Sequence, residues 1–79
     1  MKPPLTSLRS VADLRIGERA VIASFRDETL SLKLLEMGCL PGTEIRLRNV
    51  APFGDPLLIS VSGYNLSLRR AEAATILVE

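Results

Sequence analysis

The side chains best suited to chemistry in this chain of 79 residues are one cysteine, Cys39, and a scatter of carboxylates. A thiolate can act as a nucleophile or bind a soft metal ion, but it needs a neighbouring base or further ligands. The chain has no histidine, which is the usual general base and a common metal ligand. The apolar residue Leu40 follows Cys39, so we expect a packing role for the thiol. A metal-ligand role, alone or across a dimer, is the weaker alternative.

The carboxylates have no spacing that marks a paired acid and base. They include Asp13, Glu18, Asp27, Glu28, Glu36, Glu44, Asp55 and Glu72. Scattered charges of this kind usually lie on a solvated surface. The segment Gly54-Asp55-Pro56 is not a phosphate-binding loop, because no glycine-rich run precedes a helix that starts with Lys and Ser or Thr. The sequence therefore predicts a protein that is not an enzyme.

The composition predicts one small domain with an aliphatic core, since hydrophobic residues make up 47% of the chain and aromatic residues only 4%. The net charge of +1 argues against a nucleic-acid binder. The alternative of a nucleic-acid-binding barrel stays open if Arg46, Arg48, Arg69 and Arg70 form one basic strip. We expect neither a signal peptide nor a membrane span, and therefore a cytoplasmic protein.

The elements that position these residues begin after a flexible lead, expected over residues 1–9, and residues 10–79 form the expected domain. Ser10 caps a predicted helical turn over 10–14, and a strand is predicted over 18–25. The spacing of Leu30, Leu34 and Met37 predicts one helix over 27–37, capped by Asp27 or Thr29. Leu32 and Leu35 lie off this stripe. Either the barrel covers both sides of the helix, or these two leucines belong to a partner-binding face.

The second half of the chain predicts strands. Gly38 ends the helix, and Pro41-Gly42 turns the chain into a strand over 43–50 with Ile45 and Leu47 on one face. A loop follows over 51–56. A two-residue turn at Ser62-Gly63 then pairs the apolar residues of 57–61 with those of 64–68, including Val61 with Tyr64, on one face. A helical turn over 70–74 and a strand over 75–79 complete a mainly β fold of about five strands, which we expect to bend into a closed sheet.

Taken together, these segments resemble the ferrous iron transport protein A (FeoA) family from about Ser10 to Glu79. The motifs that carry the resemblance are Leu14-Arg15-Ile16-Gly17-Glu18, Leu34-Leu35-Glu36-Met37-Gly38, Pro41-Gly42-Thr43-Glu44, Gly54-Asp55-Pro56, Gly63-Tyr64, Leu66-Ser67-Leu68-Arg69 and Glu72-Ala73-Ala74. Two positions depart from the family. Cys39 stands where a larger aliphatic residue is usual, and Leu32 stands where a basic residue is expected.

The resemblance implies a small SH3-like β-barrel with one α-helix between its first and second long strands and a short helical turn before its last strand. It implies a non-enzymatic accessory of bacterial ferrous iron uptake, recruited to the inner face of the membrane by the FeoB permease. No cofactor is expected beyond weak binding of Fe(II) or another divalent metal, and self-association stays open. A metal-sensing barrel like the C-terminal domain of iron-dependent repressors is the alternative.

We expect the helix end and the corner after it to form the contact surface, and the turn residues of the motifs to have structural roles. The expected partner contacts are Leu32, Leu35, Glu36, Met37, Cys39 and Leu40. The expected structural positions are Gly17, Gly38, Pro41, Gly42, Gly54, Asp55, Pro56 and Gly63.

Overall fold

The computed structural model describes residues 9–79, so the predicted flexible lead lies outside the described residues except for Arg9. The strands are β1 (Arg9–Ser10), β2 (Arg19–Phe25), β3 (Glu44–Val50), β4 (Leu57–Val61), β5 (Tyr64–Leu68) and β6 (Ile76–Val78). The helices are the 3₁₀ turn η2 (Val11–Asp13), α1 (Glu28–Glu36) and α2 (Arg70–Ala73). The mainly β prediction, with α1 between the first two long strands and α2 before the last strand, is confirmed.

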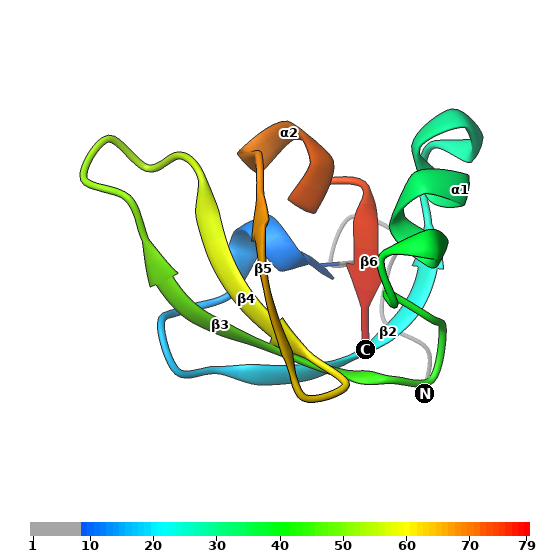
Figure 1. Cartoon of the computed structure of the whole chain (residues 1–79), viewed down its shortest axis with the longest axis horizontal. Coiled ribbons are helices and arrows are strands. Elements are labelled where there is room, and N and C mark those ends of the chain that lie inside the picture. The colour runs from blue at the N-terminus through cyan, green and yellow to red at the C-terminus, as the bar shows by residue number, and fades with distance from the viewer. Residues whose placement is uncertain (1–8) are drawn as a thin grey trace.

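All neighbouring strands are antiparallel, in the order β1-β6-β2-β3-β4-β5 (Figure 1). The sheet bends strongly, and its two outer strands, β1 and β5, do not pair with each other, which leaves a gap in the ladders. The helical turns η2 and α2 pack against each other across this gap. The barrel is therefore closed by side chains and helical turns at one seam, and by backbone ladders everywhere else.

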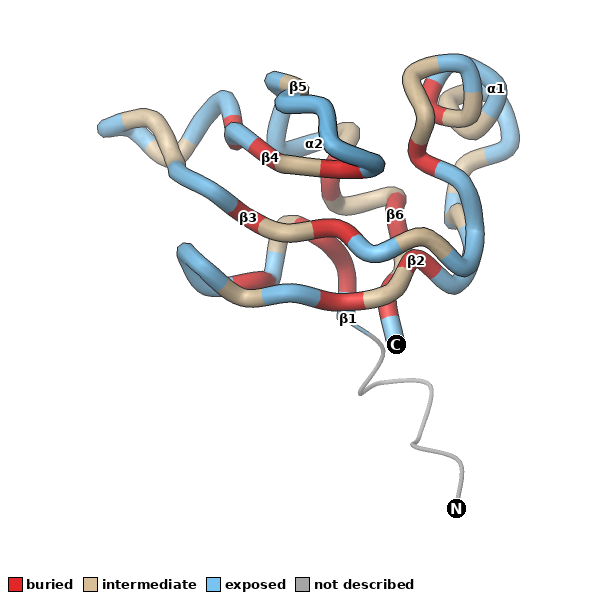
Figure 2. The backbone as a smooth tube through the Cα atoms, turned by 60° about the horizontal axis from the view of Figure 1, so that its bottom comes forward, coloured by how far each residue is buried: buried red, intermediate tan, exposed pale blue. Residues whose placement is uncertain are grey.

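The core is aliphatic, as the composition predicts. Its fully buried side chains come from every long strand and all three helical elements, and Figure 2 shows the buried segments facing one another inside the bent sheet. They include Val11, Ile22, Leu34, Ile45, Leu47, Leu57, Ile59, Val61, Leu68 and Ile76. The predicted alternation is confirmed in β3, where Ile45 and Leu47 point inward. Each strand thus contributes one face to a single core.

The β4–β5 hairpin has the predicted turn and register. Ser62 and Gly63 have φ values of 50° and 81°, which suit a tight turn between twisted strands, and Val61 pairs with Tyr64. The side chain of Tyr64 itself is 69% exposed. β5 is an outer strand of the sheet, so its first residue extends past the core. Val61, its partner on β4, is fully covered.

α1 begins at Asp27, whose carboxylate accepts the backbone N–H groups of Thr29 and Leu30. Its predicted apolar stripe is confirmed, since Leu34 is fully buried and Leu30 and Met37 pack partly against the core. Among the described residues of the predicted helix, only this stripe reaches the barrel interior.

Gly38 ends α1 in the left-handed conformation, with φ of 98°. The N–H of Gly38 donates to the carbonyl of Leu35 at 3.0 Å, and the N–H of Cys39 donates to that of Leu34 at 2.9 Å. These two bonds are the Schellman arrangement, which usually brings an apolar side chain after the glycine against the last turn. The other glycines predicted at turns also have positive φ: Gly17, Gly42, Gly54 and Gly63.

Candidate partner-binding surface

The outer side of α1 and the corner that follows it form the predicted partner surface. Leu32 is 68% exposed and Leu40 is 49% exposed, while Glu36 is also exposed and Leu35 is half-buried. The barrel therefore does not cover both sides of the helix. The Leu40 position is fixed by the corner, since its N–H donates to Gly38 at 2.9 Å and its carbonyl accepts from Thr43 at 3.1 Å. An apolar helix face followed by a rigid apolar turn is available for contact with another protein.

Two residues of the predicted surface do not lie on it. Cys39 is fully buried, so its assignment as a partner contact is wrong, and the packing role is the one that the structure supports. Its apolar neighbour in the Schellman corner is Leu34, which is fully buried as well. Burial raises the pKa of the Cys39 thiol and so favours its protonated form. Met37 is partly buried and packs against the core.

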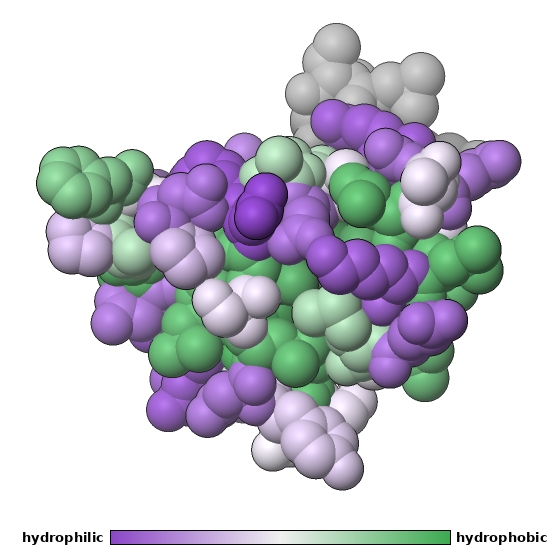
Figure 3. Space-filling model, turned by 45° about the horizontal axis from the view of Figure 1, so that its top comes forward, coloured by the Kyte–Doolittle hydropathy of each residue, from purple (hydrophilic) through white to green (hydrophobic). Residues whose placement is uncertain are grey.

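Between α1 and α2 lies an open groove with a volume of about 710 Å³. Its lining residues are Leu30, Lys33, Pro56, Ser67, Arg69, Ala71 and Glu72. Figure 3 shows this helix-bearing side of the molecule, where apolar surface lies between charged side chains. The ion pair between Lys33 Nζ and Glu72 Oε2, at 2.8 Å, joins the two helices across the groove.

The carboxylate of Glu72 accepts hydrogen bonds from both helical regions. One carboxylate oxygen pairs with Lys33, and the other accepts the backbone N–H of Arg69 at 2.9 Å, at the start of α2. The hydrogen bond from Lys33, followed by that from the Arg69 backbone, lowers the pKa of Glu72 below its ordinary value. The carboxylate is therefore ionised at neutral pH and available to both donors.

The motif Gly54-Asp55-Pro56 is hydrogen-bonded to Arg70. The carbonyl of Gly54 accepts Arg70 Nε at 2.8 Å, and the carboxylate of Asp55 accepts the backbone N–H of Arg70 at 2.9 Å. Arg70 Nη1 also donates to the carbonyl of Ala12 at 3.1 Å. One side chain thus ties the β3–β4 loop, η2 and α2 together at the seam of the barrel. Sequence reasoning missed this role, because no local pattern distinguishes Arg70 from Arg69.

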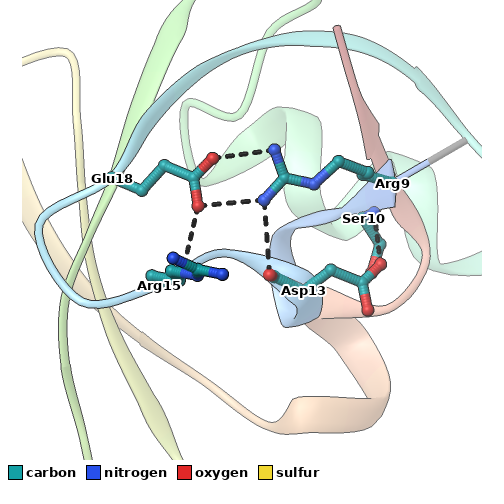
Figure 4. A network of polar contacts seen from close by, with 5 residues as sticks. All are labelled: Arg9, Ser10, Asp13, Arg15 and Glu18. Atoms are coloured by element: carbon teal, nitrogen blue, oxygen red, sulfur yellow. Dashed lines mark hydrogen bonds and ion pairs between the residues drawn. The ribbon is translucent and has the colours of Figure 1, made fainter.

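The motif that contains Gly17 is organised by Glu18, as Figure 4 shows. Both carboxylate oxygens of Glu18 accept from the guanidinium of Arg9, at 2.7 and 2.9 Å, and one also accepts the backbone N–H of Arg15 at 2.9 Å. The bond from Arg9, followed by that from Arg15, lowers the pKa of Glu18 to about 2. Asp13 caps the adjacent 3₁₀ turn by accepting the N–H of Ser10 at 2.8 Å. These polar residues fix the first turns of the domain.

Three of the four arginines of the predicted basic strip have different surroundings. Arg70 holds the seam, and the backbone of Arg69 begins α2. Arg46 lies on the sheet, directly opposite Arg19 of β2. Within residues 9–79, no three side chains of the metal-binding types lie close enough together to hold an ion.

The family model described as "FeoA domain" matches residues 9–79. A curated relative from Porphyromonas gingivalis, an Fe(2+) transport protein A/Fe(2+) transporter FeoB fusion protein, is 39% identical over 70 residues. The match covers 87% of this chain but only 8% of the length of that relative.

Two solved structures of similar proteins support the same relationship. The FeoA-like protein of Clostridium acetobutylicum is 36% identical, with a TM-score of 0.85 over 91% of this chain and 85% of that one. The zinc complex of Stenotrophomonas maltophilia FeoA, an SH3 domain protein, is 29% identical, with a TM-score of 0.78 over 89% and 88% of the two chains. The SH3-like prediction is thereby confirmed. Neither helix of the described residues has the length and apolar character needed to span a bilayer.

Proposed function

Because the chain belongs to the FeoA domain family, we propose that it is a non-enzymatic accessory protein of ferrous iron uptake that docks on a FeoB-type permease. Its site of action is the cytoplasmic part of that permease, at the inner face of the membrane. Fe(II) is then the cargo of the partner, and the chain itself acts by contact.

The observation that carries this proposal is the fusion relative, in which a domain similar to this one shares a polypeptide with FeoB. A covalent link raises the effective concentration of one domain at the other, commonly to the millimolar range. Such a link is useful when the two parts work in contact. A separate chain of the same family needs a surface of its own to reach the same arrangement.

The surface proposed for docking consists of Leu32, Leu35, Glu36 and Leu40. Leu32 and Leu40 are large apolar residues that remain exposed although the core of this small domain is otherwise well filled. They lie on a helix and on the corner that ends it, so little conformational entropy is lost when a partner covers them. A helix that presents an apolar face is a common way to enter a groove on another protein.

The test is capture of the cytoplasmic part of the permease by the purified chain carrying Leu32→Asp or Leu40→Asp. We expect each substitution to weaken binding by more than about tenfold, since a buried charge replaces an apolar contact. Ile16→Asp is the matched control, because Ile16 is 62% exposed but lies in the turn between η2 and β2. Circular dichroism establishes that each variant is folded.

Unchanged binding of both folded leucine variants would remove this surface from the proposal. Absence of any interaction between the unmodified chain and the permease would remove the docking itself.

A further inference from the structure

The loop between β3 and β4 carries the most exposed large apolar residue of the described chain. Phe53 is 98% exposed, and the loop projects from one end of the barrel, at the left of Figures 1 and 3. An aromatic side chain in this position forgoes one of the largest burial gains available to any residue. Aromatic residues that protrude in this way are typical anchors of protein contacts.

The loop is held in place by hydrogen bonds. The N–H of Gly54 donates to Ala51 at 2.7 Å, and the N–H of Ala51 donates to Pro56 at 3.0 Å. Arg70 binds the carbonyl of Gly54 from the neighbouring helix at 2.8 Å. Phe53 therefore sits on a braced turn, and little conformational entropy remains to be lost when it is buried.

A hollow suited to an aromatic ring lies at the base of the same loop, with a volume of about 360 Å³. Its lining residues are Asn49, Val50, Ala51, Pro52, Pro56, Leu58 and Ser67, none of which is charged. Leu58 is 39% exposed on the outer side of β4 and offers an apolar wall. The larger groove between α1 and α2 is less suitable, because Lys33, Arg69 and Glu72 line it.

We propose that this end of the barrel is a self-association surface, on which Phe53 of each copy enters the hollow beside Leu58 of the other. A two-fold dimer needs one patch that is complementary to itself. The projecting ring and the hollow meet this need, because they lie within a few residues of each other on one loop and its flanking strands. The net charge of +1 adds little repulsion between copies.

The size of the patch sets the expected strength. A stable dimer of standard size buries about 800 Å² on each partner. That is close to a seventh of the 5306 Å² accessible surface of this chain. Because the proposed patch is one loop and its base, we expect a weak dimer. None of the four docking residues lines the hollow, so the dimer does not depend on the permease contact.

Sedimentation equilibrium of the whole chain, from tens of micromolar to about 1 mM, tests the proposal. We expect the unmodified chain to associate reversibly, and Phe53→Ser and Leu58→Ser each to raise the dissociation constant at least about tenfold. Leu32→Ser, which alters an exposed apolar residue of α1, is the control and leaves association unchanged. Phe53→Ser retains capture of the permease, which separates this surface from the docking surface.

Three results would overturn the inference. The first is a chain that stays monomeric at 1 mM, which would assign Phe53 to a different partner. The second is undiminished association of folded Phe53→Ser. The third is loss of association in Leu32→Ser, which would place the contact on α1.

Discussion

The two helices of the domain are attached to the barrel in opposite ways. α1 has nine residues, but Leu34 is its only fully buried side chain, and one ion pair links it to α2. α2 has four residues, and its first residue, Arg70, bonds to the β3–β4 loop and to η2. The shorter helix is therefore tied to more of the molecule than the longer one.

This difference shows that how firmly a helix is bonded to the barrel depends on where the helix lies, and not on its length. α2 lies at the seam between β1 and β5, where strand pairing is absent and side-chain bonds must hold the sheet together. α1 lies outside the ladders and rests on a narrow apolar stripe. Segments with few buried contacts open more readily than the core, and such segments often meet partners.

The largest expected effect comes from removing the anchor of α1. Leu34→Ala should lower the free energy of unfolding by about 2–5 kcal/mol, because it deletes a buried side chain and leaves a cavity. Urea unfolding measures this loss. If α1 opens separately from the barrel, a thiol reagent should reach Cys39 in this variant well before global unfolding.

The matched control is Leu32→Ala on the exposed side of the same helix, which should change stability by less than about 0.5 kcal/mol. Reaction of Cys39 only at the global unfolding transition of Leu34→Ala would mean that α1 is as integral to the fold as α2. The contrast between the two helices would then fail.

A smaller effect is expected at the seam. Arg70→Ala removes the bonds from the guanidinium to Gly54 and Ala12, and should cost about 1–2 kcal/mol in urea unfolding. Arg48→Ala, at an exposed arginine of β3, is the control and should change stability by less than about 0.5 kcal/mol. Equal stability of the two variants would show that the seam does not depend on Arg70.

The smallest effect is expected where the helices meet. Lys33→Met should lose about 0.2–1 kcal/mol at pH 7, the range for an ion pair at the surface. The pKa of Glu72 is lower in the folded chain than the ordinary 4.5. Its contribution is therefore fully present above that value and is lost as the pH falls through the lowered pKa.

Urea unfolding of the unmodified chain and of Lys33→Met should be measured from pH 7 down through the lowered pKa of Glu72. The difference in stability between the two proteins should shrink in acid. Glu36→Gln, an exposed carboxylate change on α1, controls for loss of a charge on the helix. A difference that persists unchanged after Glu72 is protonated would assign the effect of Lys33 to packing rather than to the ion pair.

The roles of residues that follow from a local sequence pattern were predictable. The roles that depend on distant parts of the chain were not. The Ser62-Gly63 hairpin follows from matched apolar residues, and the end of α1 follows from Gly38. The pairing of Tyr64 with Val61 follows from the same match, but the exposure of Tyr64 depends on β5 being an outer strand. That order is a property of the whole sheet.

The candidate site shows the same division. Leu32 could be proposed as a contact because it lies off the apolar stripe of its own helix, and it is exposed. Cys39 was placed on the same surface by proximity in sequence, yet the turn at Gly38 directs it into the core. Arg70 contacts Ala12, 58 residues away, and no local spacing encodes that distance.

The pairing of β1 with β6 brings Arg9 opposite Val78, so the described domain starts and finishes on one border of the sheet. A longer polypeptide could be joined at either terminus and would leave from the same place. Figure 1 shows that the β3–β4 loop lies at the far end of the molecule from this border. A linker at the N-terminus or at the C-terminus would then hold the domain by this border and leave the Phe53 end free to contact another molecule.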